Sequence, residues 1–286
     1  IPHEIEAKRL YRGKGGELLR LGVSRLIGAV ARAHLDLGIS VASGPNLRAK
    51  KVLAKIYQAT LDENLRHPSE EIQFEAAAAL GKFAEKYWKA GLVDGAAQVK
   101  EYLTPPPDDN PATKRGKVLA LAEIPKQETI GKLPEIFGAF VAALKEKSDA
   151  ETRRNSADSL RKLYWKVKGE STGSKIAVDI AEALLTGAWD YGMDHRGDVG
   201  SWVRERSFSG LHDLLLDLAA GDDFPLTDAL MHKIIQKFLM GCCERINRLR
   251  EHSFRLFIDI LYAPHPALSK KIQCHSTLVS LLPKYL

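Results

Sequence analysis

The cysteine and histidine side chains best suited to bind a metal ion are Cys242, Cys243, His252, Cys274 and His275. Zinc sites usually draw their ligands from closely spaced pairs such as Cys-x-x-Cys or His-x-x-x-His. Neither spacing occurs in this chain. The sequence therefore predicts ordinary packing residues at these positions, with no metal and no other cofactor.

Patterns for phosphate binding and catalysis are weak. The stretch GKGGE at 13–17 is rich in glycine, but it lacks the Gly-Lys-Ser/Thr ending and the preceding strand that a phosphate-binding loop requires. It is predicted to be a loop. No acid, base and nucleophile form a recognisable catalytic set, so we expect no catalytic residues and no enzyme activity in the isolated chain.

The sharpest local feature is the loop HRGDVG at 195–200. Its two glycines permit backbone angles that other residues avoid, and Asp198 can cap the next helix or pair with a basic neighbour. On one interpretation the loop ties neighbouring helices together through a contact between Asp198 and Arg204. On the other it binds a partner protein through Arg196, Asp198, Trp202 and Arg204, since Trp and Arg dominate interface energies. The burial of Trp202 separates the two interpretations.

Two basic clusters are candidates for binding an acidic partner. One starts at Arg153 and Arg154, which we include among the candidate partner-binding residues. The other members of this first cluster are Arg161, Lys162, Lys166 and Lys168. The second cluster consists of Arg245, Arg248, Arg250 and Arg255. Such runs are either solvated faces or surfaces that steer an acidic protein, and steering predicts association that weakens steeply with salt.

Composition limits the class of protein. The 286 residues are 45% hydrophobic and 27% charged, with a net charge of +6, enough apolar content to bury a substantial core. No apolar run approaches the roughly 18 residues of a membrane span, and a modest positive excess does not by itself indicate nucleic-acid binding. Three cysteines fit a reducing cytosol. The first ten residues lack an initiator Met and a signal-peptide pattern, so the chain is interpreted as a fragment of a longer one.

The elements that carry these residues are predicted to be helices. The segment EEIQFEAAAALGKFAEKYW at 70–88 places apolar residues on one stripe at helical spacing. Pro68, Ser69, Glu70 and Glu71 supply cap and first-turn chemistry at its start. The only β-like stretch is GISVAS at 38–43. The sequence therefore predicts an all-α chain.

A recurring pattern places an apolar residue before an anchor position, usually basic, with a further apolar residue eight positions after the first. The anchors are Arg20, Gln73, Arg115, Arg153, Arg204 and Arg250. Their spacing is 38 to 53 residues, near the roughly 40 to 47 of HEAT or armadillo repeats. Six repeats of an α-solenoid fit the length. Asn110-Pro111 marks a helix start and 192–201 a turn between helices, and we predict a single domain over 1–286.

The residues now described carry a family resemblance. The stretch HRGDVGSWVRE at 195–205 resembles the signature of the tubulin-specific chaperone D family, the β-tubulin folding cofactors D. Further blocks resemble the C-terminal half of that family in the same order, namely GGELLR at 15–20, ENLRHPSEEIQFEAAAAL at 63–80, ETRRNSADSL at 151–160 and CERINRLREHSFRLFIDIL at 243–261. Nearly the whole chain is covered, and the stretch after His265 resembles the family least.

The resemblance implies a cytoplasmic, cytoskeleton-associated chaperone that handles β-tubulin. It implies assembly with αβ-tubulin, with the tubulin-folding cofactors C and E, and with an Arf-like small GTPase. The family takes part in stimulating GTP hydrolysis by tubulin, with the chemistry credited to an arginine of cofactor C, so this chain is expected to act as a scaffold. The repeat pattern alone equally allows another HEAT-repeat adaptor, such as a nuclear-transport receptor or a phosphatase scaffold. The stretch RGDVGSWVR favours the first interpretation.

Overall fold

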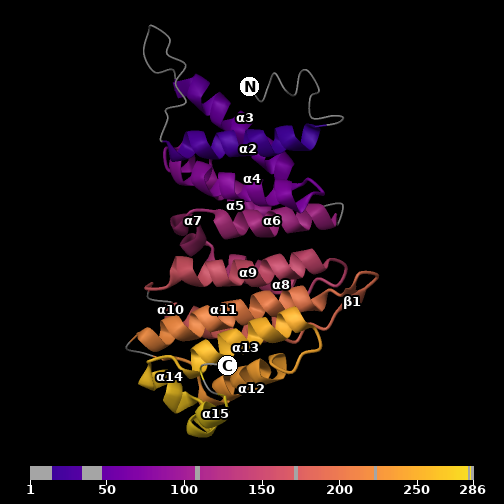
Figure 1. Ribbon diagram of the computed structural model, residues 1–286. Helices are drawn as coiled ribbons and strands as arrows, with labels where there is room; N and C mark the ends of the chain where they lie inside the picture. Colours follow the sequence, from indigo (N-terminus) through magenta and orange to yellow (C-terminus); the bar gives the residue numbers. More distant parts are fainter. Residues whose placement is uncertain are drawn as a thin grey trace. The chain divides into compact units, whose positions relative to one another are not determined.

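The computed structural model describes residues 15–33, 47–106, 110–170, 173–221, 224–282 and 284. The regular secondary structure of these residues is almost entirely helical, which confirms the predicted all-α fold of stacked helical repeats (Figure 1). The β-like stretch at 38–43 lies outside the described residues. Within the described ranges, no helix combines the length and the apolar character that crossing a membrane requires.

Contacts within the chain divide it into two compact units, Ile1–Ala139 and Phe140–Leu286. Each unit is described by itself, and the single domain over 1–286 stays a prediction. Unit 1 contains α2 (Gly16–Arg32), α3 (Leu47–Leu65), α4 (Glu70–Phe83), its π-helical continuation η1 (Ala84–Trp88), α5 (Gly95–Leu103), α6 (Pro111–Glu123) and α7 (Lys126–Gly131). The division falls within α8 (Leu133–Leu144).

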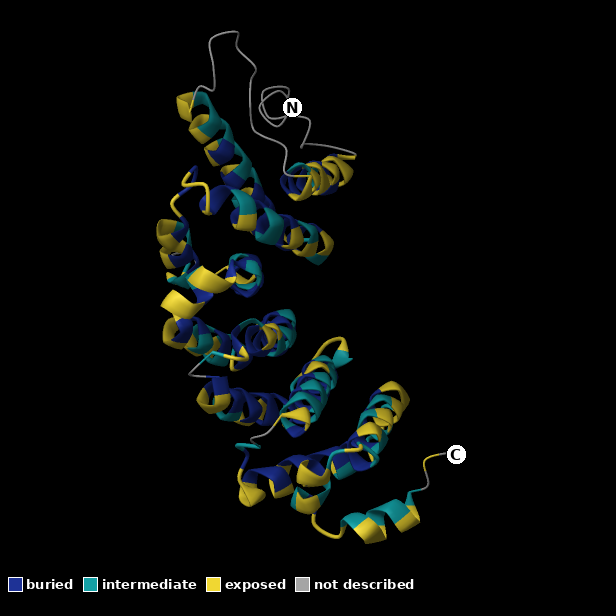
Figure 2. Cartoon of the chain, turned by 90° about the vertical axis from the view of Figure 1, so that its left-hand side faces the viewer, coloured by how far each residue is buried: buried dark blue, intermediate teal, exposed yellow. Residues whose placement is uncertain are grey.

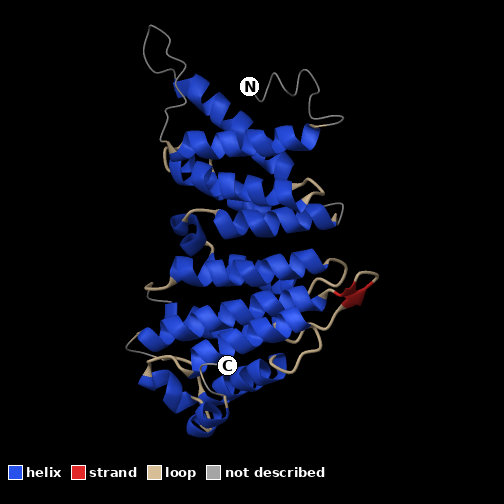
Figure 3. Ribbon diagram, viewed as in Figure 1, coloured by secondary structure: helices blue, strands red, loops and turns tan. Residues whose placement is uncertain are grey.

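Unit 2 contains the remaining helices and the two short strands of the described chain, drawn red in Figure 3. Its elements are α9 (Ala150–Val167), α10 (Gly173–Gly187), β1 (Met193–Asp194), β2 (Gly197–Asp198), α11 (Gly200–Ala220), α12 (Asp228–Gly241), α13 (Asn247–Leu261), α14 (Pro266–Lys271) and α15 (His275–Leu281).

The six anchor residues lie on alternate helices, which we call the anchor helices: α2, α4 and α6 in unit 1, and α9, α11 and α13 in unit 2. In unit 1, α4 packs against both α2 and α6, and in unit 2, α11 packs against both α9 and α13. The other long helices pair with them, α3 with α4, α10 with α11, and α12 with α13. The repeat register predicted from the sequence therefore corresponds to a layer of anchor helices in each unit.

The apolar position that closes each repeat pattern lies in the core. Ile27, Leu80, Leu160, Leu211 and Phe257 are all almost fully buried. Burying one such side chain contributes about 1.5–3 kcal/mol, which is why the anchor helices stack along this stripe. Figure 2 shows the buried side of the anchor helices turned toward neighbouring helices within the unit.

Two helix starts test the predicted capping. Asn110 caps α6 through its side chain, which accepts a hydrogen bond of 2.9 Å from an amide, and Pro111 is the first helical residue, as predicted. Ser69 occupies the cap position of α4 without making a side-chain cap bond, so the predicted cap contact is wrong there. The carboxylates of Glu70 and Glu71 remain in the first turn, where they favour the exposed N–H groups.

The loop predicted at 13–17 is wrong for its last two residues. Gly16 and Glu17 are the first residues of α2, and Gly15 precedes them with a left-handed φ of +89°. Residues 13 and 14 lie outside the described residues. Any other residue at position 15 would be strained in this left-handed conformation. The helix begins directly after this glycine.

Gly116 lets α6 approach the end of α3 closely in unit 1. A Cβ atom built at this position would lie 2.6 Å from the carbonyl carbon of Leu65. That is inside the contact distance of non-bonded atoms, and the obstacle is backbone that cannot rotate away. The packing of α3 against α6 therefore requires glycine.

We predict that Gly116→Ala destabilises the chain by on the order of 1–3 kcal/mol or more, because the methyl group overpacks a backbone contact. Gly22→Ala is the matched control, since Gly22 lies in α2 and its Cβ would meet nothing within 4 Å. That control should stabilise the chain by up to about 1 kcal/mol through helix propensity. Urea unfolding followed by circular dichroism measures both variants, and equal stabilities would contradict the close approach.

Candidate protein-binding site

The predicted turn at 192–201 is a small β-hairpin between α10 and α11. Met193 pairs with Asp198 and Asp194 with Gly197, with the turn between the two strands. Gly197 has a φ of +104°, as the sequence analysis expected of a loop glycine. Gly200 is needed for a different reason, because a Cβ there would lie 2.5 Å from the Asp190 carbonyl oxygen. The glycines therefore set both the turn and the close base of the hairpin.

Asp198 makes both contacts that its position in the sequence suggested. Its carboxylate accepts a hydrogen bond of 3.0 Å from the Ser201 amide at the start of α11. The same carboxylate pairs with the guanidinium of Arg204 at 2.8 Å. The predicted contact between Asp198 and Arg204 is thereby confirmed, and it fixes the hairpin to the first turns of α11.

Arg204 is completely buried, with 0% of its side chain exposed. Besides Asp198, its guanidinium donates to the Asp190 carbonyl oxygen at 2.5 Å. Its Nε lies 3.1 Å from a carboxylate oxygen of Glu244, near enough for an ion pair but outside the hydrogen-bond angle. Arg204 therefore holds three segments of unit 2 together, and its side chain is not open to a partner.

The contacts continue as a ladder of alternating arginines and acidic residues, which are bound through their carboxylates or their backbone carbonyl groups. Arg153 on α9 donates to the Asp190 carboxylate at 2.5 Å, and Arg250 on α13 donates to the Glu244 carbonyl oxygen at 2.9 Å. Asp190 thus lies between Arg153 and Arg204, and Glu244 between Arg204 and Arg250. We call these five residues the arginine ladder. Three of its members are anchors of successive repeats.

The two acidic members of the ladder were missed by sequence reasoning, although a signal exists. Asp190 and Glu244 each follow by three residues a glycine, Gly187 or Gly241, that ends the helix packed on an anchor helix. A Cβ at Gly241 would lie 2.8 Å from the Ser253 hydroxyl oxygen of α13. The spacing Gly-x-x-acid therefore marks the ends of α10 and α12, where they approach the next anchor helix.

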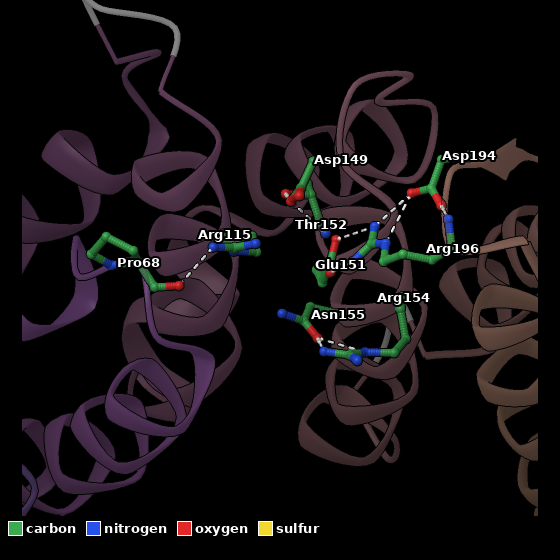
Figure 4. A network of polar contacts seen from close by, with 9 residues as sticks. All are labelled: Pro68, Arg115, Asp149, Glu151, Thr152, Arg154, Asn155, Asp194 and Arg196. Atoms are coloured by element: carbon green, nitrogen blue, oxygen red, sulfur yellow. Dashed lines mark hydrogen bonds and ion pairs between the residues drawn. The ribbon is translucent and has the colours of Figure 1, made fainter. Parts of the chain in front are cut away.

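Arg196 connects the tip of the hairpin to α9. Figure 4 shows its guanidinium between the carboxylates of Glu151 and Asp194, and it pairs with Asp194 at 2.7 Å. Burial acts to raise the pKa of Glu151, but hydrogen bonds, led by the one from Arg196, outweigh it and lower that pKa to about 2. The Arg196 guanidinium also lies 4.9 Å from the centre of the Trp202 ring. Trp202 is half-buried, so it is neither a core plug nor a free anchor.

The structure brings five of the six predicted partner-binding residues together, at the hairpin and the arginine ladder. Arg196 and Trp202 are open to solvent in part, whereas Arg153 and Arg204 are buried and hold the loop. Arg154 is half-buried and hydrogen-bonds the Asn155 side chain at 2.9 Å, as Figure 4 shows. Partner binding by all six stays a prediction, with structural contacts now assigned to Arg153, Asp198 and Arg204.

An exposed group of large apolar side chains lies beside the hairpin and was not predicted. Trp189, Tyr191 and Met193 are 49%, 47% and 70% exposed, and we call them the aromatic shelf. The Nζ of buried Lys237 lies 4.1 Å from the Trp189 ring centre, and the Arg204 guanidinium lies 4.1 Å from that of Tyr191. Cations on their inner side therefore fix two exposed rings in place.

Lys237 is completely buried on α12 and donates a hydrogen bond of 2.9 Å to the Tyr191 hydroxyl. That hydroxyl in turn donates to the Glu244 carboxylate at 3.0 Å. Burial lowers the pKa of Lys237 to about 8, against the charge of Glu244, which acts to raise it. The ammonium thus connects the aromatic shelf to the arginine ladder.

The first basic cluster is largely neutralised in the structure. Arg161 pairs with Asp213 at 2.5 Å and Lys168 with Asp217 at 2.7 Å, both across from α9 to α11. Lys162 lies 3.5 Å from Asp158 on its own helix. Arg161 and Lys168 therefore link two anchor helices, and these basic residues do not form an unbalanced positive face.

Neither a metal cluster nor a catalytic elbow emerges from the described residues. Among them, no group of three or more His, Cys, Asp or Glu could hold a metal ion, and burial raises the pKa of the Cys242 thiol to about 12. The sequence was expected to contain no Gly-x-Ser-x-Gly elbow, but 169–173 has that spacing. Its serine lies outside the described residues, and the element that precedes it is helix α9, whereas a nucleophile elbow follows a strand.

Comparison with known proteins gives further evidence on the family resemblance. No family model matches the chain. The tubulin-specific chaperone D of Dictyostelium discoideum is 24% identical over an alignment of 381 positions, gaps included, which covers 97% of this chain and 25% of the relative. The chain thus spans about a quarter of the length of the curated relative it matches. The match supports the resemblance noted in the sequence.

We predict that Arg204→Ala destabilises unit 2 by about 3–5 kcal/mol, because it leaves the largely buried carboxylates of Asp198 and Glu244 without this cation. Arg245→Ala is the control, since Arg245 is exposed at the start of the α13 region, and it should change stability by less than about 0.5 kcal/mol. Urea unfolding measures both. Similar losses in the two variants would show that the ladder does not stabilise the unit.

Lys237 predicts a specific dependence of stability on pH. Its pKa is about 8 in the folded chain against 10.5 ordinarily, so between these values the unfolded chain binds more protons. The free energy of unfolding therefore gains a contribution from Lys237 that rises with pH across that window. Its full size is on the order of 3–4 kcal/mol, since one pKa unit corresponds to about 1.4 kcal/mol.

Lys237→Met removes this contribution. Its free energy of unfolding, relative to the original chain, should be most favourable below the folded-state pKa and should decline as the pH rises above it. Lys233→Met is the matched control, because Lys233 is exposed one helical turn away on α12. A difference between Lys237→Met and the original chain that stays constant with pH would contradict the assignment.

Proposed function

We propose that this chain is a non-catalytic, protein-binding scaffold of a tubulin-folding chaperone. The observation that carries the proposal is the alignment of 97% of the chain with a tubulin-specific chaperone D. The ordered blocks of sequence, including RGDVGSWVR at 196–204, support it. Since the relative is about four times longer, we propose this role for one part of a larger chaperone.

The architecture suits binding of proteins more than chemistry. Stacked helix pairs create extended surfaces on which partners lie. The aromatic shelf adds rigid exposed rings, and interface energies concentrate in Trp, Tyr and Arg. Because buried cations fix Trp189 and Tyr191, little side-chain entropy is lost when a partner covers them.

The six candidate residues divide into two roles under this proposal. Arg196, Trp202 and Arg154 are at least partly accessible and would contact a partner. Arg153, Asp198 and Arg204 hold the hairpin and the ladder in place beneath them. Loss of the second group would then weaken binding through the shape of the loop.

The proposed partners are β-tubulin, αβ-tubulin, the tubulin-folding cofactors C and E, and an Arf-like small GTPase. Any stimulation of GTP hydrolysis by tubulin would arise in the assembled complex, with this chain as scaffold. The proposed location is the cytoplasm, in association with the cytoskeleton. A general HEAT-repeat adaptor for nuclear transport or for a phosphatase is the alternative that the fold equally allows.

We predict that the chain binds αβ-tubulin, cofactor C, cofactor E or the Arf-like GTPase in a binding titration. The variant Trp189→Ser/Met193→Ser should weaken that binding about tenfold or more, since a buried hot-spot residue contributes about 2 kcal/mol. Leu18→Ser is the control, because Leu18 is 73% exposed on α2 of unit 1.

The same titration includes a nuclear-transport GTPase and a phosphatase catalytic subunit as decoys. Binding to a decoy with no binding to any tubulin-pathway protein would replace the proposal by the adaptor alternative. Equal losses in the shelf variant and in Leu18→Ser would remove the aromatic shelf from the interface.

A further inference from the structure

A second exposed surface of unit 2 lies where α11 packs against α13. Three pairs of side chains meet along it in register. Glu205 forms an ion pair with Arg248, the Ser209 hydroxyl lies 2.9 Å from Nε2 of His252, and His212 lies 3.6 Å from the Asp259 carboxylate. We call this row the α11–α13 seam. Its partners are four residues apart on α11 and then three, so they share one face of that helix.

Positive charge gathers around the middle of the seam. His252 is half-buried, and the exposed Arg248 and Arg255 lie four residues before it and three residues after it on the same face of α13. The exposed Arg206 lies three residues before Ser209, the residue of α11 that contacts His252. Burial lowers the pKa of His252, and the charges of these three arginines and of His212 lower it further. The main electrostatic influences on this ring are therefore all cationic, although Glu205 is close by.

The positive charge is only partly balanced. Arg248 has Glu205 as its counter-ion, whereas Arg206 and Arg255 form no ion pair with any described residue. The neighbouring seam between α9 and α11 is different, because Arg161 and Lys168 there are matched by Asp213 and Asp217. Like charges held together without counter-ions repel one another. An external anion would relieve that repulsion.

We propose that Arg206, Arg248, Arg255 and His252 form a docking site for an acidic segment of a protein partner. The inference names the chemistry of one contact and rests on the proposed scaffold function. Carboxylates of the segment lie over His252 and pair with the guanidinium groups, whose planar forks match carboxylate geometry. Neutralising the cluster removes the repulsion on His252, so docking and protonation of that ring favour each other.

The surroundings favour a protein carboxylate over a nucleic acid. Nucleic acids need a continuous basic track, because binding follows the phosphate backbone through the release of many counter-ions. Here the cluster is short and is bordered by Asp259 and Glu251, which are both exposed. Those carboxylates would repel a polyphosphate that continued along the helices. An acidic peptide can place its carboxylates on the cluster alone.

The contact between Ser209 and His252 does not act as a nucleophile and base. The Ser209 hydroxyl also has the Glu205 carbonyl oxygen as an acceptor at 3.1 Å, so the ring is not the only acceptor for its proton. The cations around His252 also oppose the imidazolium that a general base must become. The pair is better suited to hold the ring in position between the arginines.

The test uses the whole chain and a fluorescent poly-glutamate peptide in an anisotropy titration at low and at moderate salt. We expect binding that weakens with salt, and a loss of about tenfold or more in Arg206→Gln/Arg248→Gln/Arg255→Gln, since each tenfold step corresponds to about 1.4 kcal/mol. The control Arg48→Gln/Lys51→Gln/Lys55→Gln removes the same charge from exposed positions of α3 and should bind as the original chain does. Circular dichroism checks that both variants fold.

A second readout is the pKa of His252, followed by proton NMR. Poly-glutamate should raise it in the original chain, and poly-asparagine should leave it unchanged. Equal binding by the two triple variants, or a His252 pKa that does not respond to poly-glutamate, would overturn the docking site. So would tighter binding of single-stranded oligonucleotide, or full displacement of the peptide by inorganic phosphate at equal charge.

Competition with αβ-tubulin and cofactors C and E separates this inference from the proposed function. If the original chain binds one of them, and the seam variant binds it equally well without competition from the peptide, the docking site fails and the proposed function stands. If none of them binds and the Arf-like GTPase does not bind either, while poly-glutamate binds and shifts His252, the proposed function fails and the docking site stands.

Discussion

A guanidinium group without solvent exposure must find its acceptors inside the protein, and Arg204 finds them on three segments. These are the hairpin at Asp198, the loop after α10 at Asp190, and the loop after α12 at Glu244. Removing a charge from water costs several kcal/mol, which only close and complete pairing offsets. Arg204 therefore requires the three segments to be in place together. The position of the aromatic shelf follows, because Tyr191 lies on the same guanidinium.

One anchor of unit 1 meets the same requirement without charge. Gln73, the anchor of α4, donates from its side-chain amide to the carbonyl oxygens of Leu65 at 2.8 Å and Ala112 at 2.7 Å. Arg115, the next anchor, donates to the Pro68 carbonyl oxygen at 3.0 Å (Figure 4). Helix ends and loops leave carbonyl groups unsatisfied, and the anchor side chain reaches them. The anchor side chains of the repeats thus share their length and their hydrogen-bond donors, but not always a charge.

Sequence periodicity was enough to predict the anchor helices, the buried stripe and the contact between Asp198 and Arg204. These depend on residues within one helix or one turn, where spacing fixes geometry. The hairpin was missed because strands of two residues are too short to show alternation. The aromatic shelf was missed because the cation behind Trp189 is Lys237, which a different helix supplies. The neutralisation of the first basic cluster was not predicted either, because its counter-ions Asp213 and Asp217 lie on a different helix, α11.

The register of the repeat also separates structural arginines from those available to a partner. Arg153, Arg204 and Arg250 occupy the anchor position, and all three donate to the ends of neighbouring segments. Arg206 and Arg255 lie two and five positions beyond an anchor, where the helix faces outward and the ladder does not reach them. A cluster of basic residues identified from the sequence alone contains both anchor arginines and outward-facing arginines. In a stack of helices, charged residues outside the anchor positions are the ones available to a partner, unless a neighbouring helix supplies a counter-ion. Among the described residues, the α11–α13 seam lacks such counter-ions for Arg206 and Arg255, whereas α11 supplies them to Arg161 and Lys168 of the first basic cluster.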